Sequence, residues 1–272
     1  MNKIIVFFIS LASFLFANHA WSASQTLEQE LSLTAQGRVS NIIAADTLQL
    51  EDGSIIRLSG IQLPSEESHN TAPLLLDSVI EIEKDMLLNQ EVNIYQSKDP
   101  KLGRINRMGH KLAHIQRLSD GLWLQGMLLN LGLAYVKTTQ RNTGMADAMY
   151  ALEALAREEK IGLWEDDALI KHASEVSSIG GGFQIVEGKI ESVAMHNNRL
   201  YINFGKNWRD DFTVSISAQD QRHFAQAGHD PLQWGGKIIR VRGWVRDYNG
   251  PYMEIDHPQA IEFIEPSPTQ KP

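Results

Sequence analysis

The sequence of 272 residues contains no cysteine. It therefore has no disulfide framework, no thiolate metal site, no cysteine nucleophile and no cysteine for a lipid anchor. Its nine histidines show no His-Glu-x-x-His or equivalent spacing, so no zinc site is predicted. A glycine loop of the kind that cradles phosphate is missing as well. Thiol, zinc and P-loop chemistry are thus not expected.

Positive charge is also in short supply. Lys and Arg total 25 against 33 for Asp and Glu, so the formal net charge is -8. An acidic chain is not drawn to nucleic acid by its overall charge, although a local basic groove is compatible with this total. With 43% hydrophobic residues, the chain is long enough for two modest domains or one large one.

Long apolar runs are missing everywhere except at the N-terminus. There Lys3 precedes the uncharged run Ile4–Phe16, which is too short for a spanning helix and is followed by small residues. Residues 1–23 are therefore expected to be a signal peptide, with an uncleaved N-terminal anchor as the alternative. The mature protein is expected in the periplasm or outside the cell, without stable insertion into a membrane.

The first half of the chain contains strand patterns followed by helix patterns. Alternation over Leu33–Leu58 predicts three strands, with a tight turn at Asp52-Gly53. Helical spacing is found over Thr71–Leu88 and again over Met145–Lys160, with a strand at Glu91–Gln96 between them. These elements predict a strand-rich barrel that carries extra helices.

The second half is dominated by strand patterns. A polar, glycine-rich segment at 169–182 is expected to be a linker, and five short strands with one helical stretch follow over 183–265. This number and order favour a small Greek-key barrel of the OB type. Residues 266–272 are expected to be a disordered tail. The predicted fold class is α+β and mainly β, with a helix-bearing OB barrel followed by a second, small OB-type barrel.

Four stretches of the first half, in order, resemble the staphylococcal nuclease family. The family's first hairpin and the loop after it are matched by GRVSNIIAADTLQLEDGSIIRLSGIQLP, and its Asp-Arg-Tyr-Gly-Arg-x-Leu-Ala-x-Val strand is similar to NRMGHKLAHI. The next helix and strand look like DGLWLQGMLLNLGLAYV, and the closing helix with its Gly-x-Trp signature looks like ALAREEKIGLWED. The resemblance covers about residues 37–166 and implies a staphylococcal-nuclease-like domain at 33–168.

This resemblance implies calcium-dependent hydrolysis of phosphodiesters. In the family, oxygen ligands hold a cation that neutralises the phosphate, and a glutamate activates the attacking water. Two arginines stabilise the charge that builds on the phosphoryl oxygens through forked hydrogen bonds. Calcium and nucleic acid are therefore the cofactor and the partner that the resemblance implies.

Asp46 and Arg57 are functional positions that the sequence keeps. By the resemblance, Asp46 falls on the first metal-binding aspartate and Arg57 on the first phosphate-binding arginine. Gln62 falls on the second metal-binding aspartate, and its amide oxygen can bind calcium but brings no charge. Ser65 falls on the general-base glutamate, and serine is no base near neutral pH. Asp46 and Gln62 are thus the metal-ligand candidates, and the weakened set argues against calcium.

The catalytic candidates are Arg57, His110 and Glu66. The family's second arginine falls on His110, which is charged only at mildly acidic pH. Arg104 offers another Gly-Arg pair, but its use requires an insertion before the strand. Glu66 replaces the lost base only if its loop shifts by one residue. Because loss of single groups of this type costs orders of magnitude in rate, the family's reaction is not expected to run in the family's way.

Two further groups of residues are candidates for phosphate or nucleic-acid binding. In the first half they form a basic band beside the expected phosphate groove: Lys101, Arg104, Arg107 and Lys111. In the second half aromatic and basic residues are interleaved, with these candidates: Arg240, Arg242 and Trp244. Such faces stack bases and track phosphates. The alternatives are a solvated loop for the band and, for the second group, a filled barrel core or a sugar or protein ligand.

Three functions are compatible with the sequence. The first is an exported staphylococcal-nuclease-like protein whose degenerate site keeps nucleic-acid or partner binding. The second is an active metal-dependent phosphodiesterase that acts on DNA or RNA outside the cytoplasm. The third is a non-catalytic scaffold in an envelope assembly. Cleavage and binding measured with and without metal distinguish the three.

Overall fold

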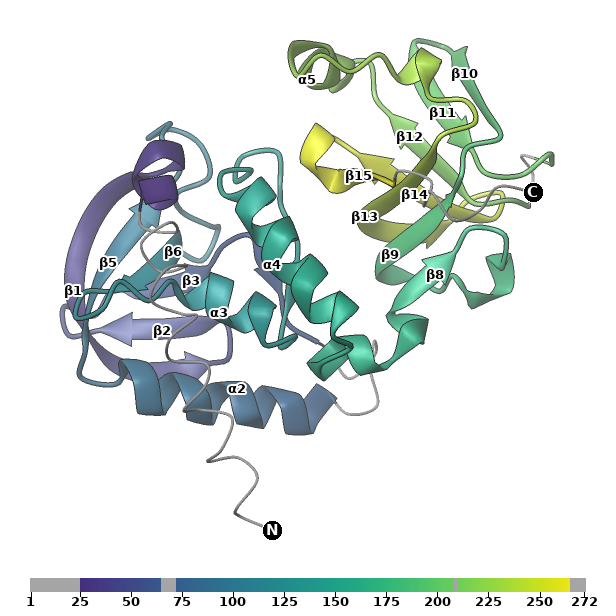
Figure 1. Ribbon diagram of the computed structural model, residues 1–272. Helices are drawn as coiled ribbons and strands as arrows, with labels where there is room; N and C mark the ends of the chain where they lie inside the picture. The colour runs from purple at the N-terminus through teal and green to yellow at the C-terminus, as the bar shows by residue number, and fades with distance from the viewer. Residues whose placement is uncertain (1–24, 65–71, 208–209, 265–272) are drawn as a thin grey trace. The chain divides into compact units, whose positions relative to one another are not determined.

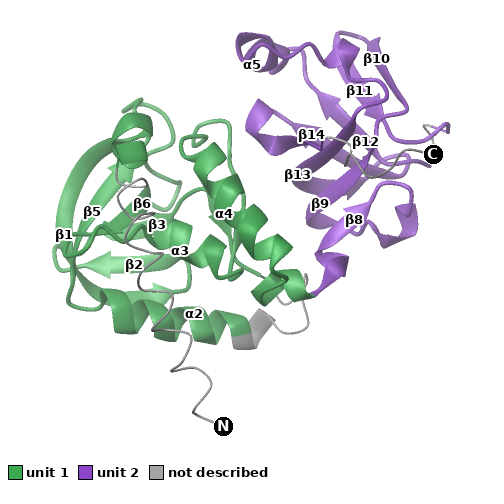
Figure 2. Cartoon of the chain, in the orientation of Figure 1, with its two compact units in different colours: residues 1–165 green, residues 166–272 purple. Residues whose placement is uncertain are grey.

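A computed structural model describes residues 25–64, 72–207 and 210–264 of the chain. The chain divides into two compact units, residues 1–165 and 166–272 (Figure 1 and Figure 2). The expected signal peptide and the candidate base Glu66 lie outside the described residues, as does the expected tail. No helix in the described part is long and apolar enough to cross a bilayer.

The first unit contains a closed barrel of five strands. The strands are β1 (Ser32–Ala44), β2 (Thr47–Leu50), β3 (Ile55–Leu58), β5 (Glu91–Gln96) and β6 (Lys111–Arg117). They follow the order β1-β2-β3-β6-β5, in which β3 and β6 run parallel and all other neighbours antiparallel. The long strand β1 pairs with both β2 and β5 because register shifts near Ala35 and Asn41 bend it.

Helices and a short extra sheet complete the first unit. α2 (Ala72–Leu87) lies along one end of the barrel, while α3 (Leu124–Asn130) and α4 (Ala146–Glu158) pack against each other (Figure 1). Outside the barrel, β4 (Ile61–Gln62) pairs antiparallel with β7 (Tyr135–Val136). α2 and α4 lie where the hydrophobic spacing predicted helices, and the predicted fold class is confirmed for this unit.

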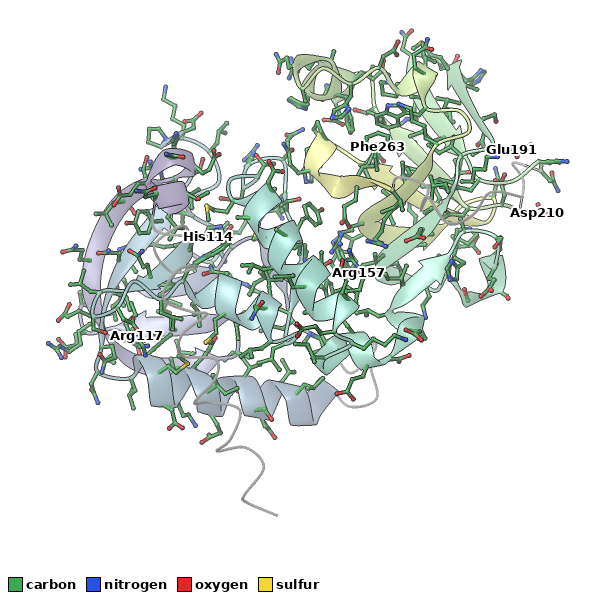
Figure 3. All side chains as sticks on the ribbon, in the orientation of Figure 1. His114, Arg117, Arg157, Glu191, Asp210 and Phe263 are labelled. Carbon is green, nitrogen blue, oxygen red and sulfur yellow. The ribbon has the colours of Figure 1, made fainter. Side chains whose placement is uncertain are left out.

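The core of the first unit is apolar, with one buried histidine. Its fully buried members include Val39, Ile56, Val79, Leu87 and Ile94. His114 (labelled in Figure 3) is 3% exposed, and burial lowers its pKa to about 3, so its ring is neutral. Its Nδ1 accepts a hydrogen bond from Nε1 of Trp123 at 3.3 Å. His114 is therefore a structural residue of the core.

The second unit contains an eight-stranded sheet. Its strands are β8 (Ile170–His172), β9 (Gly182–Lys189), β10 (Ser192–His196), β11 (Arg199–Asn203), β12 (Thr213–Ile216), β13 (Ile238–Asp247), β14 (Pro251–Ile255) and β15 (Ile261–Ile264). The path is β10-β11-β12-β14-β13-β9-β8, and β15 pairs with the first half of β13. The short helix α5 (Gln221–Gln226) lies between β12 and β13 in the chain.

β9 and β10 are two halves of one interrupted strand. At the break, Ile190 accepts from Gly236 at 2.8 Å and donates to Lys237 at 2.9 Å, whereas Glu191 (labelled in Figure 3) donates to Asn203 at 2.9 Å. The chain therefore leaves β13 and joins β11 at this point, and the path of strands closes on itself. The order of strands, with β12 parallel to β14, repeats that of the first barrel. The second unit thus has the OB-type arrangement predicted from the sequence.

The segment that we expected to be a linker contains ordered backbone. Within 169–182, β8 pairs parallel with β9, placing Ile170 opposite Ile185. The N–H of Ala173 then donates to the oxygen of Glu187 at 2.8 Å. Small and polar side chains suggested a linker, but strand pairing uses backbone groups and tolerates such side chains at a sheet edge.

Candidate functional site

The candidate site begins at the turn between β1 and β2. Asp46 directly precedes β2, and Arg57 lies on β3, opposite Thr47. Nη2 of Arg57 contacts Oδ2 of Asp46 at 2.7 Å, and Oδ1 of Asp46 accepts a hydrogen bond from Oγ1 of Thr47 at 2.7 Å. The side chains of Arg57 and Asp46 are 46% and 30% exposed, so the pair lies at the barrel surface. Paired strands therefore hold a guanidinium that is half open to solvent.

The second part of the site is built on the β4–β7 sheet. The chain turns after β3 at Gly60, whose φ of +83° favours glycine, and continues into β4. Lys137 follows β7, and its backbone N–H donates to the oxygen of Gly60 at 2.9 Å. Its Nζ donates to Oε1 of Gln62 at 2.5 Å, while Nε2 of Gln62 donates to the oxygen of Leu63 at 2.9 Å. Both polar ends of the Gln62 amide are thus engaged.

Lys137 lies in the electrostatic field of the first pair. Burial lowers the pKa of its ammonium, Arg57 lowers that pKa further, and Asp46 raises it. Lys137 is bonded to Gly60 and Gln62, which follow the strand of Arg57, and its charge is affected by Arg57 and Asp46. We therefore call Asp46, Arg57, Gln62 and Lys137 the corner site. The corner site contains two cations, one carboxylate and one neutral amide.

A buried carboxyl group lies near the corner site. Glu83 on α2 is 1% exposed, and its Oε1 has no hydrogen-bond partner in the described part of the chain. Burial, with the charge of Asp46 as the second cause, raises the pKa of Glu83 to about 9. Glu83 is therefore protonated at neutral pH and adds no negative charge beside Asp46.

Calcium is the cofactor that the family implies, but the described residues of the corner site do not fit it. Calcium takes about six to eight oxygen ligands, among which carboxylates supply the charge. Here both expected ligands already contact a cation of the chain: Asp46 contacts Arg57, and Gln62 contacts Lys137. Within residues 25–64, 72–207 and 210–264, no three His, Asp or Glu side chains are grouped to hold a metal ion. No catalytic step through calcium follows from this set.

His110 and Lys111 lie beside the strand of Arg57. β6 runs parallel to β3, with Lys111 opposite Ile56. His110 precedes β6, and its backbone N–H donates to Oδ1 of Asn106 at 3.0 Å. Its Nδ1 is buried and, among the described residues, has no hydrogen-bond partner. The structure therefore brings both candidates to the barrel strand next to β3, at its N-terminal end.

The basic band is partly tied down. Lys101, Arg104 and Arg107 lie in the loop between β5 and β6, where Lys101 and Arg107 are exposed, whereas Lys111 is the first residue of β6. Arg104 instead folds back on the loop, where its Nε donates to the oxygen of Ser97 at 2.8 Å and its Nη2 to that of Lys98 at 3.3 Å. Arg104 thus holds the loop in shape, whereas Lys101 and Arg107 face solvent.

The candidates of the second unit are of two kinds. Arg240 and Arg242 are only 7% and 4% exposed. Nη2 of Arg240 contacts Oε2 of Glu187 at 2.6 Å, and Nη2 of Arg242 contacts Oε1 of Glu262 at 2.6 Å. Trp244, on the same strand, is 64% exposed. The arginines are engaged in ion pairs, while Trp244 presents an aromatic ring to solvent.

Sequence reasoning missed two residues of this region, Lys137 and Glu83. Lys137 follows the strand pattern of AYV and carries no motif of its own. Glu83 does leave a signal, because it lies four residues after Val79 and four before Leu87, on the stripe that faces the core. A charged residue on such a stripe indicates a buried carboxyl group.

The fold and the site define a class of protein. It is an OB-type barrel with a helix between its third and fourth barrel strands and an arginine–aspartate pair at its surface. Residues 55–166 match the model of the family described as staphylococcal nuclease homologue, which confirms the resemblance over that range. Among curated proteins, no sequence matches this chain.

Proposed function

We propose that this chain is an exported protein whose staphylococcal-nuclease-like unit binds nucleic acid without cleaving it. The observation that carries the proposal is the 2.7 Å contact between Arg57 on β3 and Asp46 in the turn before β2. It fixes a half-exposed guanidinium, and by the family resemblance Arg57 falls on a phosphate-binding arginine. A fixed, planar fork of N–H donors suits a phosphodiester oxygen pair.

Binding is favoured over hydrolysis by what the corner site lacks. Hydrolysis of a phosphodiester needs a base to activate water and a compensating charge for the leaving oxygen. Ser65 takes the position of the family's glutamate and is no base near neutral pH. Gln62 takes the position of a carboxylate and has Lys137 as its partner. Both changes remove catalytic groups and leave positive charge in place.

Each unit by itself has a surface suited to nucleic acid. In the first unit, Lys101 and Arg107 are exposed on the loop that leads into β6, beside the strand of Arg57. In the second unit, Trp244 and Tyr248 are 64% and 62% exposed on an OB-type barrel. Cations track a phosphate backbone, and exposed aromatic rings stack on bases.

Binding to labelled oligonucleotides tests the proposal. Fluorescence anisotropy of the chain without residues 1–23 is measured with single- and double-stranded DNA and RNA over a salt series. We expect salt-sensitive binding that Arg57→Ala weakens by about tenfold, the value of one charge-assisted hydrogen bond. Arg38→Ala is the matched control, because Arg38 is also a barrel arginine, 42% exposed and paired with Glu91 at 2.9 Å. It should change binding less than twofold.

Two outcomes would replace the proposal. Metal-dependent cleavage that disappears in Arg57→Ala would identify an active phosphodiesterase. If the protein neither binds nor cleaves nucleic acid, the remaining function is a scaffold in an envelope assembly. Export is tested separately by fractionating cells that express the full chain, and by sequencing the N-terminus of the exported protein. A new N-terminus near residue 24 supports the signal peptide.

A further inference from the structure

We propose that the ammonium of Lys137 supplies the positive charge that a divalent metal supplies in related nucleases, so that the corner site binds phosphate without metal. This inference deepens the proposed function, since phosphodiester binding rests on that proposal. The replacement of the metal by a lysine rests on the contacts and charges of the corner site.

Lys137 is held in position by backbone and side chain together. Its backbone N–H donates to Gly60 at 2.9 Å, and the adjacent pair Val136–Ile61 locks β7 against β4. Its Nζ donates to Oε1 of Gln62 at 2.5 Å. The paired strands fix the backbone of Lys137. If its ammonium left Gln62, it would lose a hydrogen bond to a partly buried amide. The ammonium of Lys137 is thus a fixed part of the corner site.

The residue at position 62 is consistent with a lysine in place of a metal ion. Gln62 has the shape of a glutamate but no charge, so it accepts one strong hydrogen bond and does not attract a divalent ion as a carboxylate does. An aspartate at the same place would pair with the ammonium or with a metal. The neutral amide of Gln62 therefore favours the single positive charge of the Lys137 side chain over a divalent metal ion.

The net charge of the corner site distinguishes a phosphodiester ligand from a divalent cation. Among the described residues, Arg57 and Lys137 carry one positive charge each and Asp46 one negative charge, while Gln62 is neutral, so these four side chains have a net charge of about +1 at neutral pH. The buried Glu83 is protonated at this pH and does not change the sum. A divalent cation would raise the local charge to about +3, whereas one phosphodiester would neutralise it. The site is complementary to a phosphate and repels a second cation.

Calcium alone is the probe for this inference. Thermal unfolding is followed with about 5 mM CaCl2 or with chelator for the wild type, Gln62→Asp, Lys137→Met and the double variant. A ligand raises the melting temperature only when it binds the folded state. We expect no calcium effect in the wild type or in Gln62→Asp, and a rise of several degrees in the double variant, which regains the carboxylate and loses the cation. Lys84→Met, an exposed charge-matched change on α2, should behave as the wild type.

A second measurement keeps the inference testable if the double variant does not fold. Binding of labelled DNA is measured in chelator, where the wild type should bind as well as in calcium. Lys137→Met should bind about five- to tenfold more weakly, and Lys84→Met within twofold of the wild type.

The outcomes distinguish this inference from the proposed function. If calcium stabilises the wild type and Asp46→Asn removes that effect, the lysine does not replace the metal, even if nucleic acid binds. Equal calcium responses in all four proteins would overturn the inference as well. If the calcium results are as expected but no nucleic acid binds, the proposed function fails, phosphate binding at the corner site fails with it, and only the exclusion of the metal by Lys137 stands.

Discussion

Nζ of Lys137 lies 2.5 Å from Oε1 of Gln62, although the two residues are 75 positions apart in the chain. The β4–β7 sheet brings them together, because Gln62 and Tyr135 are opposite each other in its register. Arg57 and Asp46 act on the charge of Lys137, so two cations of the chain engage Asp46 and Gln62, the two residues that the family resemblance predicts as metal ligands.

As pH rises, the affinity for nucleic acid should begin to fall at a lower pH than the loss of charge from an ordinary lysine would cause. Burial and Arg57 lower the pKa of Lys137 below its usual 10.5, and Asp46 only partly offsets them. As pH rises, the ammonium therefore loses its proton and its charge before a free lysine does. Affinity measured from pH 7 to pH 10 should decline in the wild type and stay flatter in Lys137→Met. Parallel profiles for the two proteins would contradict this prediction.

Glu83→Gln should remove a pH dependence of stability. The pKa of Glu83 is about 9 in the folded protein and near 4.5 in the unfolded chain. Between these values only the folded state keeps the proton, so the free energy of unfolding falls as pH rises, by about 1.4 kcal/mol per pH unit. From pH 5 to pH 8 the wild type should lose on the order of 4 kcal/mol relative to Glu83→Gln. Guanidinium unfolding of both proteins at the two pH values measures this, and equal slopes would show that Glu83 is not buried as described.

Gly60→Ala should destabilise the first unit more than Gly53→Ala. Both glycines have φ of +83°, which costs an alanine about 1 kcal/mol. A Cβ at Gly60 would also lie 2.8 Å from Sδ and Cε of Met149, whereas at Gly53 nothing lies within 4 Å. We expect a loss of about 2–4 kcal/mol for Gly60→Ala and about 1 kcal/mol for Gly53→Ala. Chemical denaturation compares them, and similar losses would refute the tight packing at the turn into β4.

Arg240 and Trp244 should separate stability from binding in the second unit. Arg240→Met leaves the carboxylate of Glu187 without its 2.6 Å partner in a partly buried place, which costs about 3 kcal/mol. Trp244→Ala removes a mostly exposed ring and should change stability by less than about 1 kcal/mol. If this barrel binds a single strand, Trp244→Ala should weaken binding severalfold. Unfolding curves and anisotropy on both variants test this, and a stable Arg240→Met with lost binding would reverse the assignment.

Much of the fold could be predicted from hydrophobic spacing. The alternation over Leu33–Leu58 predicted three strands, and the spacing over Thr71–Leu88 predicted the helix that the structure has at Ala72–Leu87. The break between β9 and β10 could not be predicted, because the alternation runs through Ile190. It depends on a change of hydrogen-bond partner from β13 to β11, which no local pattern encodes.

The site was less accessible to prediction, for a related physical reason. The sequence placed Asp46 and Arg57 by their motifs, but the ammonium that engages Gln62 comes from a strand far along the chain. The strand pattern of the second half correctly put Arg240 and Trp244 on one strand. It did not reveal that Arg240 is covered and paired, because Glu187 reaches it only through the register of β9 with β13.

Metal-independent binding without cleavage is tested most directly by one measurement on the wild type. Labelled DNA and RNA are incubated with the chain lacking residues 1–23, in calcium and in chelator, and both the bound fraction and the integrity of the strand are recorded. We predict equal, salt-sensitive binding in the two conditions and intact strands in both. Cleavage that requires calcium, or binding that disappears in chelator, would contradict the central claim.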